Sequence, residues 1–229
     1  ECYSDATAHE NWVDLEKDSS VGPVLSKPAS SMMAAPDVQH AWQFDANNCD
    51  AKDMVGNMHG SLKNGATCDN DGLRLNFGSS AHNGDQQHVD LGTYQAFGNE
   101  FSFAMWVKFK DETPSQARLF NIGSKSTGNF IFADSSAAQG QMTFQAYRTG
   151  TNVGPTASNY WTKNVWTHVV VTVNSNGDKQ VFKNRVLTST ASGNAGLPNV
   201  DRDVFHLGKS DGTIDIHGIN DGRAKDLQR

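Results

Sequence analysis

The stretch FSFAMWVKF (Phe101–Phe109) decides the fold class, because its side chains alternate in character with a period of two residues. One face is apolar throughout: Phe101, Phe103, Met105, Val107 and Phe109. The other face is mixed: Ser102, Ala104, Trp106 and Lys108. This pattern predicts a β-strand with one face in a hydrophobic core.

Further stretches follow the same period. LRLNF (73–77) and QMTFQAY (141–147) alternate, and WTHVVVTVNSNGDKQVFKNRVL (166–187) predicts a β-hairpin. Asn176-Gly177 in that hairpin suits the positive φ angles of a type I′ turn. Helical candidates are short, so the sequence predicts an all-β fold, a two-sheet antiparallel sandwich of the jelly-roll type.

Length and composition narrow the class of protein. The chain has 229 residues, enough for one β-sandwich core. Residues 1–37 are polar and rich in Pro and Ser, which predicts a leader or arm before a domain spanning 38–229. The 19 Lys and Arg residues against 25 Asp and Glu give a net charge of −6, which argues against a nucleic-acid partner. No apolar run is long enough for membrane insertion by a helix.

Three cysteines cannot all pair within the chain. A Cys49–Cys68 disulfide would close a loop of about 20 residues and stabilise the fold by roughly 3 kcal/mol. Reduced cysteines in a cytosolic protein are the alternative. Cys2 would remain for an intermolecular disulfide or another form of self-assembly.

Several motifs, in order, resemble a known family. AWQFD (41–45) and DMVGNMHGSL (53–62) are similar to its opening strand and glycine loop, with Val55 where serine is usual. VDLG (89–92) before FSFAMWVKF is similar to its central strand. WTHVVVTV (166–173) and QVFKNRVL (180–187) resemble its Trp-x-His-Val hairpin, with Arg185 in place of a glycine. FHLGKSDGTIDIHGINDGRAKDL (205–227) resembles its closing segment.

This family is the laminin-G-like jelly roll of the concanavalin A-like lectin/glucanase superfamily. The resemblance implies a secreted or cell-surface recognition module that binds glycans or extracellular proteins. It also implies a structural calcium ion and, in most members, no catalysis.

The resemblance places a candidate calcium site in the DMVGNMHGSL loop. Asp53 and Asn57 would supply side-chain oxygens, with a carbonyl near Gly60. In the resembled fold the closing strand lies beside the opening one, which would add Asp215. The alternative is an Asx-type turn at Asp53 and Asn57 with no metal. No Cys or His spacing supports zinc.

Aromatic rings and planar donors are the groups that bind sugars. The predicted ligand surface consists of Lys108, Arg118, Tyr147, Arg148, Tyr160 and Trp161. Tyr160 and Trp161 stand in a polar context, so at least one of them is expected to face solvent. Trp106 and Trp166 are expected to pack.

Two other classes of function are the alternatives. A structural or adhesion subunit would use the N-terminal arm and Cys2. A hydrolase would need the Glu-x-Asp-x-Glu strand of its superfamily members, which is absent. A lyase would need more than His88 of QQHVD (86–90), so the chain is predicted not to be an enzyme.

Overall fold

The structure is a computed structural model of the whole chain. It describes residues 38–76, 87–93, 99–109, 117–123, 129–135, 140–148, 151–193, 197–209 and 225–228. The chain divides into two compact units, Glu1–Val38 and Gln39–Arg229. Val38 is the one described residue of the first unit, so the predicted arm and Cys2 lie outside the described residues, and the strands belong to the second unit.

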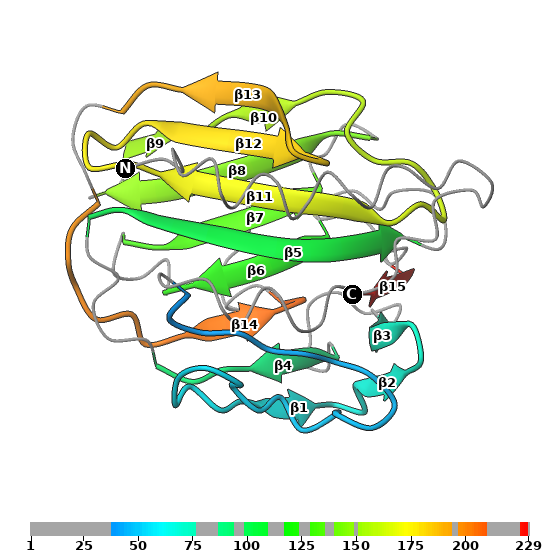
Figure 1. Cartoon of the computed structure of the whole chain (residues 1–229). Helices are drawn as coiled ribbons and strands as arrows, with labels where there is room; N and C mark the ends of the chain where they lie inside the picture. Colours follow the sequence, from blue (N-terminus) through cyan, green and yellow to red (C-terminus); the bar gives the residue numbers. More distant parts are fainter. Residues whose placement is uncertain are drawn as a thin grey trace, which may run out of the picture. The chain divides into compact units, whose positions relative to one another are not determined.

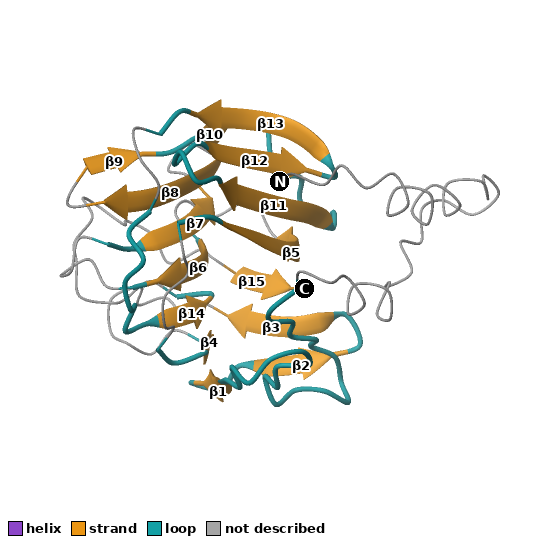
Figure 2. Cartoon of the chain, turned by 60° about the vertical axis from the view of Figure 1, so that its left-hand side comes forward, coloured by secondary structure: helices purple, strands orange, loops and turns teal. Residues whose placement is uncertain are grey.

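The second unit is a sandwich of two antiparallel sheets, as predicted (Figures 1 and 2). The first, here called the β6 sheet, has the order β1-β4-β14-β6-β7-β8-β10, with β9 paired to β8. Its strands are β1 (Ser61–Lys63), β4 (His88–Asp90), β6 (Arg118–Ile122), β7 (Ile131–Ser135), β8 (Met142–Arg148), β9 (Thr151–Val153), β10 (Thr156–Ala157) and β14 (Phe205–Leu207).

The second layer, the β5 sheet, has the order β13-β12-β11-β5-β15-β3-β2. Its strands are β2 (Thr67–Asp69), β3 (Gly72–Asn76), β5 (Phe101–Phe109), β11 (Thr167–Val173), β12 (Lys179–Lys183), β13 (Val186–Ala191) and β15 (Lys225–Gln228). Figure 1 shows β5 and β11 in front of β6, β7 and β8. In the part of the chain that the structure describes, no helix is long and apolar enough to cross a membrane.

The alternating stretches form strands because each buries one face between the sheets. FSFAMWVKF is β5, and Val107 and Phe109 are buried at its end. β11 pairs with β5 in register from Thr167 opposite Val107 to Val173 opposite Phe101. LRLNF and QMTFQAY likewise lie within or overlap β3 and β8. The period of two therefore predicted these strands correctly.

The β11–β12 hairpin forms, but the predicted type I′ turn at Asn176-Gly177 is wrong. Gly177 alone of that pair has a positive φ, 83°. The N–H of Gly177 donates to the carbonyl of Asn174 at 2.8 Å, and the Asn174 side chain accepts the N–H groups of Asn176 and Asp178. The Asn174 side chain thus stabilises a five-residue loop, 174–178, in place of the two-residue turn.

Positive φ at two successive residues occurs instead at Asn184 (48°) and Arg185 (71°), between β12 and β13. An L-residue in this region costs roughly 1–2 kcal/mol, a cost that glycine does not bear. Arg185→Gly is therefore expected to raise the free energy of unfolding by about 1 kcal/mol in urea titrations. Exposed Lys163, whose φ is negative, is the matched control, and Lys163→Gly is expected to give no gain. Equal effects of the two changes would contradict the strain at Arg185.

The disulfide between Cys49 and Cys68 is formed, with Cα atoms 5.6 Å apart. It joins the segment before Asp53 to β2, an edge strand of the β5 sheet. The reduced alternative is therefore not the state found in this structure.

Candidate functional site

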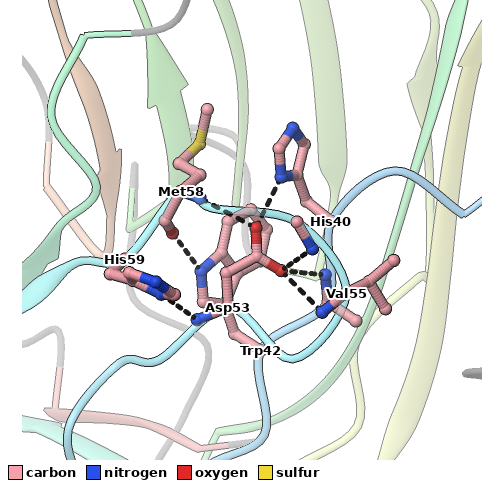
Figure 3. A network of polar contacts seen from close by, with 8 residues as sticks. His40, Trp42, Asp53, Val55, Met58 and His59 are labelled. Carbon is pink, nitrogen blue, oxygen red and sulfur yellow. Dashed lines mark hydrogen bonds and ion pairs between the residues drawn. The ribbon is translucent and has the colours of Figure 1, made fainter.

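Asp53 is the centre of the DMVGNMHGSL loop and is only 2% exposed. Both of its carboxylate oxygens accept hydrogen bonds (Figure 3). The five donors are the backbone N–H groups of Ala41 (3.1 Å), Val55 (3.1 Å), Gly56 (3.0 Å) and Met58 (3.0 Å) and Nδ1 of His40 (2.6 Å). Burial raises the pKa of Asp53, but the bonds from His40 and the backbone outweigh it and hold the pKa well below its usual range.

Neighbouring side chains extend the network around Asp53. The Asp53 N–H donates to Nδ1 of His59 at 3.1 Å, and Nε1 of Trp42 donates to the carbonyl of Met58 at 2.9 Å (Figure 3). Trp42 also meets the core ring of Phe205 edge-on at 5.9 Å. The loop is thereby attached at two points: Asp53 accepts the N–H of Ala41, and Met58 is bonded to Trp42, which packs on the core.

The two glycines of this loop are required by packing. A Cβ at Gly56 would lie 2.6 Å from Nδ1 of His40 and 2.7 Å from the carbonyl oxygen of Gln39. A Cβ at Gly60 would lie 2.8 Å from the carbonyl oxygen of Asp90. Larger residues would push the loop away from these groups.

These contacts bear on the predicted calcium site. Calcium needs oxygen lone pairs, but the Asp53 carboxylate already accepts five N–H bonds, and Asn57 is exposed. The N–H of Gly60 donates to Ala51. In this conformation Asp53 does not fit a directly bound calcium ion, and the arrangement resembles the Asx-turn alternative. Asp215 lies outside the described residues, so the four-residue calcium site stays a prediction.

Tyr160 and Trp161 are buried, at 1% and 8% exposure, so the expectation that at least one faces solvent is wrong. The Tyr160 hydroxyl donates to the carbonyl of Phe182 at 2.5 Å, and Nε1 of Trp161 donates to that of Gln141 at 2.9 Å. Burial raises the pKa of Tyr160. Because both polar tips find carbonyl partners, the rings are free to bury beside the core despite their polar neighbours in sequence.

Lys108 lies apart from the other predicted ligand residues. It is on the outward face of β5, where its Nζ is 3.2 Å from Asp71 and 4.9 Å from the centre of the Trp166 ring. Trp106 packs against His168 on the same sheet. Arg118 and Tyr147 belong to the β6 sheet, and Arg148 ends β8 with its side chain outside the described residues. The predicted ligand set is therefore divided between two sheets.

The outward face of the β6 sheet, turned away from the core, carries two rows of mainly polar side chains. The strand registers place one row across six strands: Ser61, Asp90, His206, Asn121, Phe132 and Gln145. A second row crosses four strands: Arg118, Asp134, Thr143 and Thr156. Neighbouring positions on the core side are apolar: Val89, Leu207, Phe120, Ala133 and Phe144.

An ion pair lies within this face. Nη1 of Arg118 is 3.2 Å from Oδ2 of Asp134, and the Arg118 guanidinium lies 3.7 Å over the Phe132 ring. Both charged side chains are buried. Burial raises the pKa of Asp134 to about 6, although the Arg118 charge acts to lower it. The carboxyl group is thus poised to gain or lose a proton in mildly acidic solution.

Three stacked rings adjoin the ion pair. Phe130 stacks on Tyr147 with centroids 4.0 Å apart and on Phe132 at 5.5 Å. Tyr147 is half-buried, and its hydroxyl donates to Oε1 of Gln145 at 3.1 Å. Burial raises the pKa of Tyr147. Tyr147 and Gln145, both partly exposed, therefore place an aromatic ring and an amide two residues apart on one strand. We call Arg118, Phe130, Phe132, Asp134, Gln145 and Tyr147 the β8 cluster.

Sequence reasoning found only Arg118 and Tyr147 of this cluster. Asp134 and Phe132 sit in IFADS, a stretch that is buried on both faces and therefore lacks a clear alternation. Their proximity to Arg118 depends on the β6–β7 register, which shifts between Arg118 and Phe120. The one charged residue of IFADS, Asp134, was the available signal.

The two antiparallel sheets packed face to face form a β-sandwich. The chain belongs to the family described as Laminin_G_3 of the concanavalin A-like lectin/glucanases superfamily, whose model matches residues 83–219. This confirms the resemblance drawn from the motifs. No curated protein matches the chain.

Several solved structures share the fold at low sequence identity. One concerns botulinum neurotoxin type C and its interaction with two ganglioside molecules, with TM-score 0.54, 13% identity and coverage of 75% of this chain and 48% of that chain. The binding domain of botulinum neurotoxin DC in complex with rat synaptotagmin II gives the same values. The binding domain of Paraclostridial Mosquitocidal Protein 1 has TM-score 0.50, 16% identity and coverage of 75% and 49%. The chain spans about half the length of these structures.

Proposed function

We propose that this protein is a non-catalytic, extracellular glycan-binding module that uses the outward face of the β6 sheet. The observation that carries the proposal is the β8 cluster, where the partly exposed Tyr147 ring lies beside the Gln145 amide on a rigid strand. Sugars are bound by such a combination, in which a ring stacks on C–H groups and a planar polar group bonds adjacent hydroxyls.

The cluster is prepared for binding because its side chains are held before any ligand arrives. Phe130 stacks on the Tyr147 ring, and Arg118 is held by Asp134 and lies over the neighbouring Phe132 ring. Ordering side chains on binding costs about 0.5–1.5 kcal/mol each, so a held ring retains more of its contact energy. The buried members support the site, and Tyr147 and Gln145 are the proposed contacts.

The lectin-like family supports a carbohydrate rather than another class of ligand. The net charge of −6 disfavours nucleic acid. Structural relatives include a toxin domain that interacts with gangliosides and one in complex with a protein, synaptotagmin II. The Cys49–Cys68 disulfide supports an oxidising, extracellular location. An extracellular protein is accordingly the alternative partner.

A glycan array followed by calorimetry on the best binder tests the proposal. Tyr147→Ala is expected to weaken binding by about twofold to tenfold, because stacking on one ring contributes roughly 0.5–1.5 kcal/mol. Gln145→Ala is expected to weaken it similarly through lost hydrogen bonds.

The matched control is Gln180→Ala, on β12 of the β5 sheet, which is expected to leave affinity unchanged. An array without any binder, or equal losses for Gln145→Ala and Gln180→Ala, would count against this site. Unchanged melting temperatures of the variants would show that the loss arises in the site and not in the fold.

A further inference from the structure

The four sheet edges of this sandwich differ in how they are protected. Three are formed by very short strands: β1 and β2 with three residues each, and β9 and β10, which both pair with β8, with three and two. β1 carries Lys63 and β2 carries Asp69. Short strands and charges are the usual protection against pairing with another chain. These three edges are therefore poor templates for strand addition.

β13 (Val186–Ala191, VLTSTA) is different. It ends the β5 sheet, has six residues and contains no charge, proline or glycine. Val186 is 64% exposed and Leu187 is 46% exposed. Its one lateral partner among the described strands is β12. The Ser189 hydroxyl reaches the carbonyl of Thr156 on β10, which links the two sheets, while Thr188 and Thr190 remain exposed.

We propose that β13 is a self-association edge, at which two copies of the chain pair antiparallel about a two-fold axis and join their β5 sheets. A two-fold axis pairs β13 with β13 of the other copy. A charged residue on this strand would therefore lie close to the same charge on the other copy and repel it. VLTSTA has none, and its β-branched residues suit cross-strand packing. The pairing therefore has no like-charge repulsion along the strand.

The ends of β13 are complementary in charge, which favours a second copy over an unrelated strand. The basic Arg185 immediately precedes β13, and beyond its other end the N–H of Gly193 donates to the Asp178 carboxylate at 2.9 Å. Antiparallel pairing brings the first end of each copy to the second end of the other. Arg185 of one copy would then lie near Asp178 of the other, twice in the dimer.

Sedimentation velocity across a micromolar concentration series tests this proposal. The full chain with Cys2→Ser is used, so that a disulfide at Cys2 cannot hold two copies together. A concentration-dependent dimer is expected. In the double variant Thr188→Lys/Thr190→Lys, the added lysines of both copies lie on one face of the paired strands beside one another, and the dissociation constant is expected to rise at least about tenfold.

The control is Ser102→Lys/Ala104→Lys, which adds the same charge to exposed positions in the interior of the β5 sheet. It is expected to leave the dimer intact. A monomer at every concentration, or a dimer that resists both double variants equally, would overturn the proposal.

Hydrogen exchange on the Cys2→Ser chain gives a second readout that needs no β13 variant. The amides of Val186–Ala191 are expected to gain protection as concentration rises, while those of the short edge strand β2 do not. Protection of β13 that is independent of concentration, or that appears only with a different protein added, would exclude self-association at this edge. Neither result depends on the proposed glycan site.

Discussion

Asp53→Ala is expected to lower the free energy of unfolding by about 3–5 kcal/mol, because five N–H donors lose a buried charged acceptor together. The measurement is chemical denaturation near neutral pH. The control is Asp50→Ala in the same segment, where an exposed carboxylate accepts one backbone N–H, from Lys52 at 3.2 Å. That change is expected to cost less than about 1 kcal/mol. A similar loss in both variants would contradict the structural role of Asp53.

The same group gives a dependence on pH with a defined sign. Its pKa in the folded state lies below the unfolded value near 4. The stability that it contributes is therefore present above about pH 4 and declines as the pH falls below that value. In Asp53→Ala this part of the acid-induced loss is expected to vanish, whereas Asp50→Ala retains it.

Calcium is tested with the same variants. If the carboxylate serves only the loop, the melting temperature is the same with calcium and with a chelator. If the sequence-based prediction of a shared site is correct, calcium raises the melting temperature, and both Asp53→Ala and Asp215→Ala abolish the shift. The second result would require the N–H bonds at Asp53 to rearrange on binding.

The fold could be predicted from the sequence because the relevant physics is local. In β5, β11 and β12, apolar and polar residues alternate, and the apolar positions indicate which face of each strand packs in the core. The turn between β11 and β12 was harder, since the Asn174 side chain competes with the favoured Asn-Gly turn by bonding two backbone N–H groups. Such competition depends on the three-dimensional path of the loop, which the local sequence does not show.

The candidate site was predicted only in part because it depends on register. Arg118, Asp134 and Gln145 come from three strands, and nothing in their separate stretches shows that they share a face. The prediction that Tyr160 or Trp161 faces solvent was wrong for a different reason. Their polar neighbours suggested exposure, but carbonyl groups distant in sequence accept their hydrogen bonds. Polarity of neighbours is a weak guide where an aromatic ring has a polar tip.

The second large effect is expected at Asp134, whose folded-state pKa of about 6 lies above the unfolded value. The folded protein therefore binds more protons than the unfolded chain between about pH 4 and 6. With respect to this group, stability is greatest below pH 4 and falls as the pH rises to 6, by roughly 3 kcal/mol for a difference of about two pKa units. Above pH 6 the loss levels off.

Asp134→Asn is expected to remove that decline, because an amide at this position does not ionise. The measurement is the free energy of unfolding at intervals from pH 4 to 7, a range in which the titration of Asp53 contributes only below about pH 5 and equally in all variants. Asp201→Asn, at an exposed position, serves as the control and is expected to keep the decline. Identical curves for Asp134→Asn and the unsubstituted chain would contradict the burial of an ionisable carboxyl group there.

The role of Arg118 follows from the same experiment. At pH 7 the Asp134 carboxylate has the Arg118 guanidinium 3.2 Å away, so Arg118→Met leaves a buried charge without its cation and is expected to cost about 3 kcal/mol or more. At pH 4 the carboxyl group is protonated, and the cost is expected to be smaller. In the double variant Arg118→Met/Asp134→Asn this dependence on pH disappears. A cost of Arg118→Met that stays constant from pH 4 to 7 would show that Arg118 acts through packing on Phe132 and not through its charge.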